Sequence, residues 1–597
     1  MKHAHKIKFS IVGRFLKTKV TEERTYFTLT LITGILAAVV TVGFQYIVNS
    51  ITTYIGTDRS FTMESFLMGG VLIAISGWLT TRYFKSTAGS GVPNVKIALA
   101  VHNGIIPLKD TVAKLVVTVF SLSSGIPLGK EGPVVTVSAG IGSFLGNFFH
   151  LSKKKIKALV AVGSAAGIAA AFNTPISAVV FTMEEVVGDL NAKILGSIII
   201  SSVAAAVTGH LLAGEHIISS KLIYQMGNPL ELFFYFLIGL AAAISGPLWM
   251  LTTLKLRVLF RQVLKDHRLS IIILGFCFVG ALSLLHPAVL GSGKGFLEKE
   301  LLSLIFDWKV LLLILVIKFF ATSLVYAAGP SGGLFMPTLL IGATLGSLIG
   351  TLGHDFFPEI VSSSASTYAL VGMGAYFVTV IRAPFTSILI VFELTRDYNI
   401  ILPVLIANVV AYMLSEKITN GSIYEQISEQ DGIHLPTRED EEILDSFSVE
   451  DALVKDVFTF NHDDTIKNVY FKLKNSDVSG FPILKNGKLF GVVAKNEVLT
   501  EMSKKNHEKK IHEVCAQKVI KVYPDQSLLV ALHLLDRFHI SRLPVVSRLD
   551  NKNLIGVITA YDILQTFGHQ LKVEKNKIEL EDKEYEKELF KNKDKDS

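Results

Sequence analysis

Long apolar segments dominate residues 26 to about 416, and they constrain the fold of this chain more than any other feature. A helix that crosses a bilayer needs roughly 20 apolar residues. Because the bilayer core offers no water to backbone amides, a crossing segment must satisfy its own hydrogen bonds, as an α-helix does. The sequence therefore predicts an all-α domain with many membrane spans. The clearest spans are 28–48, 65–84, 193–214, 232–255, 270–288 and 309–328.

Other apolar segments are shorter and are interrupted by glycine and proline. Broken segments in corresponding places of two halves are typical of the binding region of a membrane transporter. We therefore expect broken helices where this domain binds its substrate. The short segments are 133–149, 158–171, 174–187, 336–350, 367–380 and 384–395.

Composition divides the chain into regions. Only 18% of its 597 residues are Asp, Glu, Lys or Arg, against roughly 25% in soluble domains. From about residue 430 onward, however, the sequence is typical of a soluble chain. The predicted regions are a basic N-terminus (1–25), a membrane domain (26–426), a linker (427–450), two soluble blocks (451–508 and 509–570) and a charged tail (571–597).

Basic residues precede the first span, which predicts a cytoplasmic N-terminus. We interpret the net charge of +7 as a sign of topology and of contact with anionic lipids, and we expect no nucleic-acid partner. Cys277 and Cys515 lie in different regions and suggest neither a disulfide framework nor a metal site. The basic residues before the first span are Lys2, Lys6, Lys8, Arg14, Lys17 and Lys19.

The membrane domain repeats itself. A five-residue motif that ends in Pro133 recurs at Pro337, with later glycines at the same intervals, and the offset is 337 − 133 = 204 residues. Pro175 and Pro384 give a second match at an offset of 384 − 175 = 209 residues. Two matches at nearly one offset predict duplicated halves of roughly 26–215 and 230–426. The spacing alone leaves parallel and inverted repeats open.

Glu131 is the most informative single residue, in the run Gly129-Lys130-Glu131-Gly132-Pro133. An ionisable side chain at membrane depth is costly and marks an ion or proton pathway. Proline is tolerated in the first turn of a helix, so the run predicts a helix start. Helix N-termini attract anions. The carboxylate of Glu131 is therefore expected to compete with a diffusible anion and to take up a proton.

Three further segments are expected to meet Glu131 at one anion site. They are the run from Gly89 to Pro93, with the hydroxyl of Ser90; the run 333–337; and the run 422–424, with the phenol of Tyr424. None of these segments carries a fixed cation, and neutral donors let a bound anion leave again. Each feature also has a plainer interpretation: Ser90 as a helix cap, Tyr424 as an interfacial residue, and a Gly-x-x-x-Pro run as a kink or turn.

Together, the motifs GSGVP, GKEGP and GGLFMP and the late tyrosine resemble the CLC family of chloride channels and chloride/proton exchangers, over residues 26–426. The resemblance implies a homodimer with inverted repeats and one pathway in each subunit. It also implies chloride binding by Ser90, Tyr424 and the backbone amides of Leu334 and Phe335, with Glu131 as the gating glutamate. Serine in GSGVP is similar to chloride-selective members, whereas nitrate-preferring relatives often carry proline there.

Glu184 and Glu185 are adjacent carboxylates at the end of an apolar segment. In the repeat, Glu184 is matched by Glu393, which suggests a shared structural role, whereas Glu185 is matched by Leu394. An asymmetric carboxylate suits a one-sided task such as proton entry from the cytoplasm. In the exchangers of the family this position is commonly glutamate, so Glu185 favours chloride/proton exchange. A solvated helix end and a passive chloride channel remain the alternatives.

The soluble blocks share the pattern apolar-Pro-apolar-apolar followed by Gly-apolar-apolar and are predicted to alternate strands and helices. They resemble a tandem CBS pair, an α/β module that binds adenine nucleotides. In the second block Thr559 is expected to meet a phosphate and Asp562 a ribose hydroxyl of ATP, ADP or AMP. The first block has Ala494 and Glu497 at these places. The plainer interpretation of Asp562 is a helix cap or a surface acid.

No nucleophile, metal cluster or phosphate-binding loop indicates an enzyme, and no cofactor is expected to be required. A CBS-containing divalent-cation transporter is a remote alternative, because such a path would need several inward carboxylates rather than glycine-rich helix starts. The expected location is the bacterial inner membrane, with the N-terminus and the CBS pair in the cytoplasm.

Overall fold

The computed structural model describes residues 2–56, 62–190, 193–214, 228–263, 267–297, 307–361, 363–433, 444–473, 480–504, 506–538 and 540–568. The chain forms two compact units, Met1–Leu435 and Pro436–Ser597. Residues 434–443 of the predicted linker and the predicted tail 571–597 lie outside the described residues, as do the side chains of residues 2–21.

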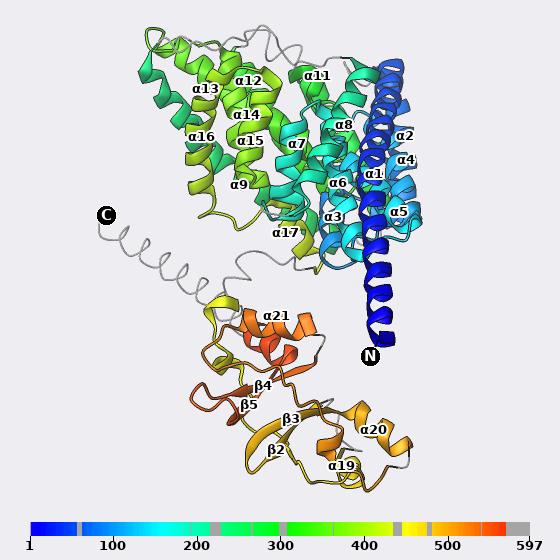
Figure 1. The fold of residues 1–597 in the computed structure, drawn as a ribbon. Helices are drawn as coiled ribbons and strands as arrows, with labels where there is room; N and C mark the ends of the chain where they lie inside the picture. The colour runs from blue at the N-terminus through cyan, green and yellow to red at the C-terminus, as the bar shows by residue number, and fades with distance from the viewer. Residues whose placement is uncertain are drawn as a thin grey trace, which may run out of the picture. The chain divides into compact units, whose positions relative to one another are not determined.

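The first unit is an assembly of helices (Figure 1). Within the described ranges, eight helices are long and apolar enough to cross a membrane, and shorter apolar helices pack among them. The helices are α1 (Lys2–Ile55), α2 (Met63–Arg82), α3 (Val92–Ala100), α4 (Leu108–Ser123), α5 (Glu131–Phe148), α6 (Lys153–Phe172), α7 (Pro175–Phe181), α8 (Leu195–Ala213), α9 (Leu232–Val263), α10 (Arg268–Ser283), α11 (Lys294–Phe296), α12 (Trp308–Ala328), α13 (Phe335–Phe356), α14 (Ala365–Ile381), α15 (Pro384–Thr395), α16 (Ile401–Ser415) and α17 (Ile423–Gln430).

The predicted spans lie on helices, although their ends differ by several residues. The span 174–187 divides into α7 and a π-helical turn, Thr182–Val187. Five helices of this unit have no counterpart among the predicted spans: the short helices α3, α11 and α17, and the longer helices α4 and α16. Helix α4 carries Lys109, Asp110 and Lys114, which interrupt its apolar pattern. Helix α16 has only 15 residues and is shorter than a typical span.

Glycines of the sequence repeat are points where helices approach closely. Helix α5 packs against α6, and α13 packs against α14. A Cβ placed on Gly142 would lie 2.1 Å from the carbonyl oxygen of Leu159, and one on Gly346 would lie 2.0 Å from that of Tyr368. Only glycine fits at such a contact. The repeat glycines therefore set the helix spacing in both halves.

The two halves of the membrane unit exchange equivalent helix caps. Glu184, from the first half, caps the start of α15 in the second half, and Glu393 caps the start of α7 in the first half. A reciprocal exchange of this kind is what a two-fold axis between equivalent elements produces. Inverted repeats related by such an axis are a common transporter architecture. The sequence repeat is therefore confirmed in the structure.

The second unit contains two small α/β halves. The first half has strands β1 (Phe460–Asn461), β2 (Gly480–Lys485) and β3 (Lys488–Ala494) in the order β1-β2-β3, and the second pairs β4 (Arg542–Val546) with β5 (Leu554–Thr559). Helices α19 (Ile466–Leu473), α20 (Lys495–Ser503) and α21 (Leu528–Phe538) complete them.

Each half of this unit has its own apolar core. Phe481, Val493 and Cys515 belong to the first core. Val449 joins the second core with residues from 522 to 563, and Val454 pairs with Val557 of β5. Residues 449–454, at the start of the unit, thus pack in the second half. The segment Ile511–Cys515 packs in the core of the first half.

Candidate functional site

Three helix starts converge near the centre of the membrane unit. Gly129, before α5, and Gly333, before α13, exchange backbone hydrogen bonds of 2.7 and 2.6 Å. Gly89, before α3, donates to Pro330 and accepts from Gly332, both at 3.1 Å. These bonds tie loops from the two halves together. The predicted convergence of GSGVP, GKEGP and GGLFMP is therefore observed.

The helices that begin here have no side-chain caps. Helix α3 starts after Gly91, α5 after Lys130 and α13 after Leu334, and none of these three residues caps its helix through its side chain. The first amides of a helix have no partner within the helix. Three such ends at one place form a region of positive potential that suits an anion.

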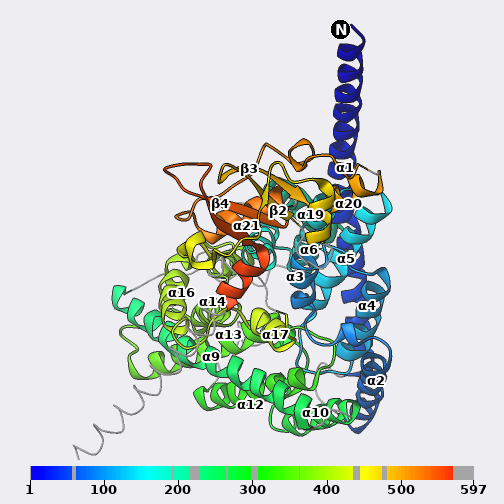
Figure 2. The same cartoon turned by 90° about the horizontal axis from the view of Figure 1, so that it is seen from below.

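Ser90 and Tyr424 bring two hydroxyl groups to the same place. Both side chains are buried, and in the described part of the chain neither hydroxyl makes a hydrogen bond of ordinary geometry. Tyr424 lies in the first turn of α17, which contacts α3, α9 and α14. In Figure 2, α17 lies in the middle of the membrane unit. Buried hydroxyls of this kind call for a ligand or water as partner.

Glu131 is the first residue of α5 and is only 2% exposed. Its carboxylate folds back over the junction of the two halves, since a Cβ placed on Gly129 would lie 2.3 Å from Oε2. A Cβ on the next residue of the motif, Gly132, would lie 2.2 Å from the hydroxyl oxygen of Ser90. The carboxylate and the serine hydroxyl thus flank one turn of backbone.

Leu334 and Phe335 begin α13 and are fully buried. The ring of Phe335 packs among three other phenylalanines, with centroid distances of 4.9 to 5.5 Å to Phe377, Phe172 and Phe181. This packing fixes the start of α13, and hence the direction of its amides, without a polar cap.

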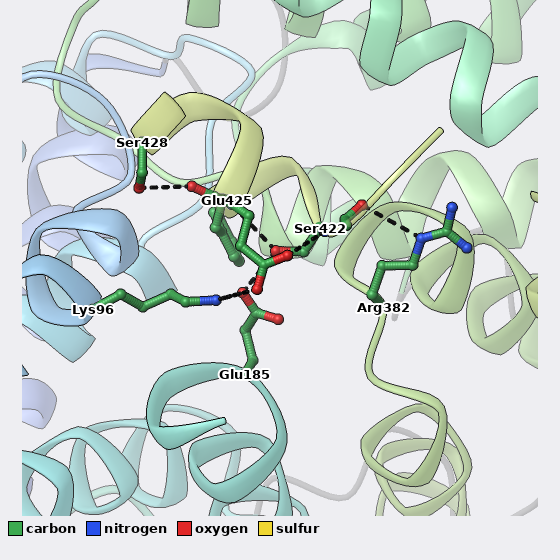
Figure 3. A network of polar contacts seen from close by, with 8 residues as sticks. Lys96, Glu185, Arg382, Ser422, Glu425 and Ser428 are labelled. Atoms are coloured by element: carbon green, nitrogen blue, oxygen red, sulfur yellow. Dashed lines mark hydrogen bonds and ion pairs between the residues drawn. The ribbon is translucent and has the colours of Figure 1, made fainter. Parts of the chain in front are cut away.

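Glu185 lies in the π-helical turn after α7 and is 3% exposed. Its Oε1 accepts hydrogen bonds of 2.8 Å from Lys96 on α3 and from the hydroxyl of Ser422, the residue that caps α17 (Figure 3). Tyr424 is close enough to both Glu131 and Glu185 for their charges to act on its phenol. The tyrosine is therefore near both carboxylates.

A cavity of about 160 Å³ reaches Ser90 and Tyr326. Arg257, Arg261 and Arg268 are among its lining residues, together with Asp431, which pairs with the first two of these arginines. A basic lining raises the local concentration of small anions. The cavity is therefore a plausible approach for an anion to Ser90.

Two buried lysines and one tyrosine were missed by the sequence reasoning. Nζ of Lys114 donates to the carbonyl oxygens of Thr87 at 2.8 Å and Gly89 at 2.7 Å. The hydroxyl of Tyr326 also lies beside Gly89. A buried lysine side chain therefore lies behind the Ser90 loop. The equivalent lysine of the second half, Lys318, is 204 residues later.

In the second unit, Thr559 and Asp562 contact each other. Oδ2 of Asp562 accepts hydrogen bonds from the backbone N–H of Thr559 at 2.9 Å and from its hydroxyl at 2.6 Å. Asp562 thus caps the helical segment 560–568. The equivalent Glu497 caps α20 by accepting from Ala494 N–H at 2.8 Å. This geometry agrees with the plainer interpretation of Asp562, that it is a helix cap.

Comparisons with known proteins agree with this architecture. The family "Voltage gated chloride channel" matches residues 70–416, and the CBS domain matches residues 449–504 and 511–569. A protein named H(+)/Cl(-) exchange transporter ClcA, from Vibrio cholerae, is 29% identical over 435 residues, which cover 70% of this chain and 92% of that protein.

Solved structures give the same result. A slow cyanobacterial Cl-/H+ antiporter aligns with a TM-score of 0.62 and 26% identity, over 68% of this chain and 98% of that one. A eukaryotic CLC transporter aligns with a TM-score of 0.66 over 90% of this chain and 98% of that one, at 20% identity, which shows the shared fold. The sequence repeat, the convergent helix starts and these matches lead to one conclusion: this chain belongs to the voltage-gated chloride channel (CLC) family and carries a tandem pair of CBS domains.

Proposed function

We propose that this protein is a secondary active antiporter that exchanges chloride for protons. The observation that carries the proposal is the position of Glu131, whose buried carboxylate lies where three uncapped helix starts meet the hydroxyl of Ser90. A carboxylate in an anion site can be replaced by a chloride ion, and its protonation changes which of the two is favoured.

Transport follows from that competition. Deprotonated Glu131 occupies an anion position at the N-terminus of α5, where its charge is stabilised by the helix end. Protonation removes this charge, so the side chain leaves and chloride enters. Chloride is then held by the hydroxyls of Ser90 and Tyr424 and by the amides of Leu334 and Phe335. Return of the deprotonated side chain expels the anion and completes the cycle.

Glu185 supplies the proton from the other end of the pathway. Its burial and the nearness of Tyr424 to both Glu185 and Glu131 support this role. We propose that water carries the proton between the two carboxylates. The counterpart of Glu185 in the second half is Leu394, which agrees with a task on one side of the membrane only.

The basic cavity that ends at Ser90 supports an anionic substrate. Its arginines, Arg257, Arg261 and Arg268, suit chloride and would repel a cation. Lys114 lies behind the same loop and donates a hydrogen bond to the carbonyl oxygen of Gly89. These groups favour anion transport over the alternative of divalent-cation transport.

The test is proton movement driven by chloride. Purified protein is reconstituted into vesicles with a chloride gradient and no proton gradient, and external pH is recorded. An exchanger moves protons against their gradient until the chloride gradient is spent. Chloride flux without any proton movement would establish the second candidate, a passive chloride channel, while Mg²⁺ flux without chloride flux would reject both.

The same proposal includes assembly and location. We expect a homodimer in a bacterial inner membrane, with the N-terminus and the CBS pair in the cytoplasm. Apolar side chains along α8 and α16, among them Val207, Leu211, Val409 and Met413, are exposed in the single chain and suit burial against lipid or a second copy. The mass of the detergent-solubilised protein, measured by light scattering, decides between one copy and two.

Nucleotide regulation of the CBS pair is the last part of the proposal. Thr559 and Asp562 follow β5 at the start of a helical segment, where a phosphate is favourably placed. Binding requires Asp562 to exchange its bond from Thr559 for a ribose hydroxyl. Calorimetry with ATP, ADP and AMP tests this, with Asp562→Ala as the variant and Asp550→Ala as the matched surface control. Absence of heat with all three nucleotides would reject nucleotide binding.

A further inference from the structure

Lys96 joins two carboxylates that come from different parts of the chain. Its Nζ donates to Oε1 of Glu185 at 2.8 Å and to Oε1 of Glu425 at 2.9 Å (Figure 3). Glu185 follows α7, Lys96 lies on α3 and Glu425 lies on α17, so the lysine links three elements. The lysine side chain is 11% exposed.

The three side chains form a path of increasing exposure. Glu185 is 3% exposed at one end, whereas the side chain of Glu425 is 30% exposed at the other. Glu425 is therefore accessible to water, and Lys96 links it to the buried Glu185. A titratable group with one polar face toward solvent and one toward a buried acid is suited to proton transfer.

The capping of α17 fixes the geometry of the cluster. Oε2 of Glu425 accepts from the backbone N–H of Ser422 at 3.1 Å, and the hydroxyl of Ser422 donates to Glu185 at 2.8 Å. Glu425 thus uses one oxygen for the cap and keeps the other for Lys96. Because Tyr424 lies between these two cap residues, the same turn of α17 holds both the chloride-binding phenol and the proton cluster.

The charges of the cluster do not balance. Two carboxylates share one ammonium group, so the set carries one negative charge and has room for one proton. Arg382, at the end of α14, also acts on Glu425 through its charge and donates hydrogen bonds to Ser415 and Thr419, and Glu184 caps α15. Among the described contacts, Lys96 is the group that donates to both carboxylates, so it is placed to pass a proton from one to the other.

We propose that Lys96 and Glu425 form the proton relay that connects solvent to Glu185, an inference that rests on the proposed exchange function. A proton from water first binds the carboxylate of Glu425. Lys96 then passes one ammonium proton to Oε1 of Glu185, breaking an N–H bond and forming an O–H bond. The neutral amine takes the proton of Glu425, which restores the ammonium and the carboxylate. One proton has moved inward, and no other reactant is needed.

A purely electrostatic role for Lys96 predicts different behaviour. Arginine keeps the positive charge but does not release a proton in proteins. If Lys96 only holds Glu185 in place, Lys96→Arg restores exchange that Lys96→Met loses. If Lys96 passes protons, Lys96→Arg and Lys96→Met both lose proton exchange to a similar degree.

The experiment measures the ratio of proton flux to chloride flux in vesicles for Lys96→Met, Lys96→Arg and Glu425→Gln. Glutamine at position 425 can still cap Ser422, so this variant tests the relay with α17 intact. The relay predicts that the ratio falls at least about tenfold in all three, while chloride flux persists and thereby shows that each protein is folded. Glu429→Gln, an exposed position one turn along α17, is the matched control and keeps the wild-type ratio.

The outcomes separate this inference from the function on which it rests. A wild-type ratio in Lys96→Arg or in Glu425→Gln overturns the relay and leaves exchange intact. Absence of proton flux in the wild-type protein overturns the exchange function, and the relay with it. Should Lys96→Met lose its chloride flux through misfolding, Glu425→Gln and Lys96→Arg decide the question.

Discussion

Glu184 and Glu393 each cap a helix in the opposite half of the membrane unit. Glu184 accepts from the backbone N–H groups of Phe385 and Thr386 at 3.1 and 2.8 Å, and Glu393 accepts from those of Ile176 and Ser177 at 2.9 and 2.7 Å. The donors are themselves equivalent, 209 residues apart. Glu184 and Glu393, which are equivalent in the sequence repeat, therefore make equivalent contacts in opposite halves.

Removing either cap should destabilise the membrane unit. Glu184→Ala and Glu393→Ala each leave two helix-start amides without their carboxylate, which costs about 1 to 2 kcal/mol for a helix cap. Thermal unfolding in detergent measures the loss, and the symmetry predicts similar values for the two variants. Glu359→Ala, at an exposed position, is the control. A large loss in only one variant would contradict the equivalence of the two caps.

The hydroxyls of Ser90 and Tyr424 should set chloride affinity. A hydrogen bond to a charged group contributes about 1.5 to 3 kcal/mol, so Ser90→Ala and Tyr424→Phe should each weaken chloride binding by about tenfold or more. Isothermal titration calorimetry with chloride measures this directly. Tyr398→Phe, whose ring is 76% exposed, should bind as the wild type does. Unchanged affinity in both site variants would place the anion elsewhere.

Lys114 and Lys318 allow a comparison within one molecule. Lys318 donates to the carbonyls of Ala288, Val289 and Gly291, as Lys114 does to those of Thr87 and Gly89. Substitution by methionine leaves these carbonyls without their hydrogen-bond donor, which costs about 1 to 3 kcal/mol of stability for each carbonyl. Both variants should therefore unfold at a lower temperature. Only Lys114→Met should also weaken chloride binding, because Gly89 adjoins Ser90. Equal loss of affinity in Lys318→Met would argue against a local role for Lys114.

Glu501 should make the first CBS half sensitive to acid. Hydrogen bonds from Lys504, Asn506 and Lys509 lower the pKa of its carboxyl to about 2, against roughly 4.3 for an unperturbed glutamate. Because the folded pKa is the lower one, the stabilisation is fully present above pH of about 4.3 and is lost as pH falls toward 2. Amide exchange across 495–503, measured between about pH 3 and pH 6, should show this dependence. Glu501→Gln should abolish it and Glu508→Gln, at an exposed position, should not.

Local signals in the sequence predicted the centre of the membrane unit. Glycine followed by proline marked the starts of α3, α5 and α13, because proline fits the first helical turn and glycine permits close backbone approach. Spacing alone revealed the repeat. The orientation of the halves did not follow from spacing, because it depends on how the equivalent helices run relative to each other in space.

Contacts between residues far apart in the chain could not be predicted from the sequence. Lys114 and Lys318 are 204 residues apart, which is the repeat offset, but the sequence does not show which carbonyl groups they contact. Lys96 meets Glu425, 329 residues away in sequence, and no periodicity predicts that encounter. In the CBS pair, the pattern around Asp562 is the same for a helix cap and for a ribose ligand, so the sequence left both open.

The reversal potential under opposed chloride and proton gradients tests the central claim, that the charge state of Glu131 couples the two ions. The account predicts that the wild-type potential lies between the chloride and proton equilibrium potentials and shifts when either gradient is changed. In Glu131→Gln, which cannot take up a proton, chloride flux should persist and the potential should equal that of chloride alone. A wild-type potential that follows chloride alone, or a Glu131→Gln potential that still responds to pH, would contradict the account.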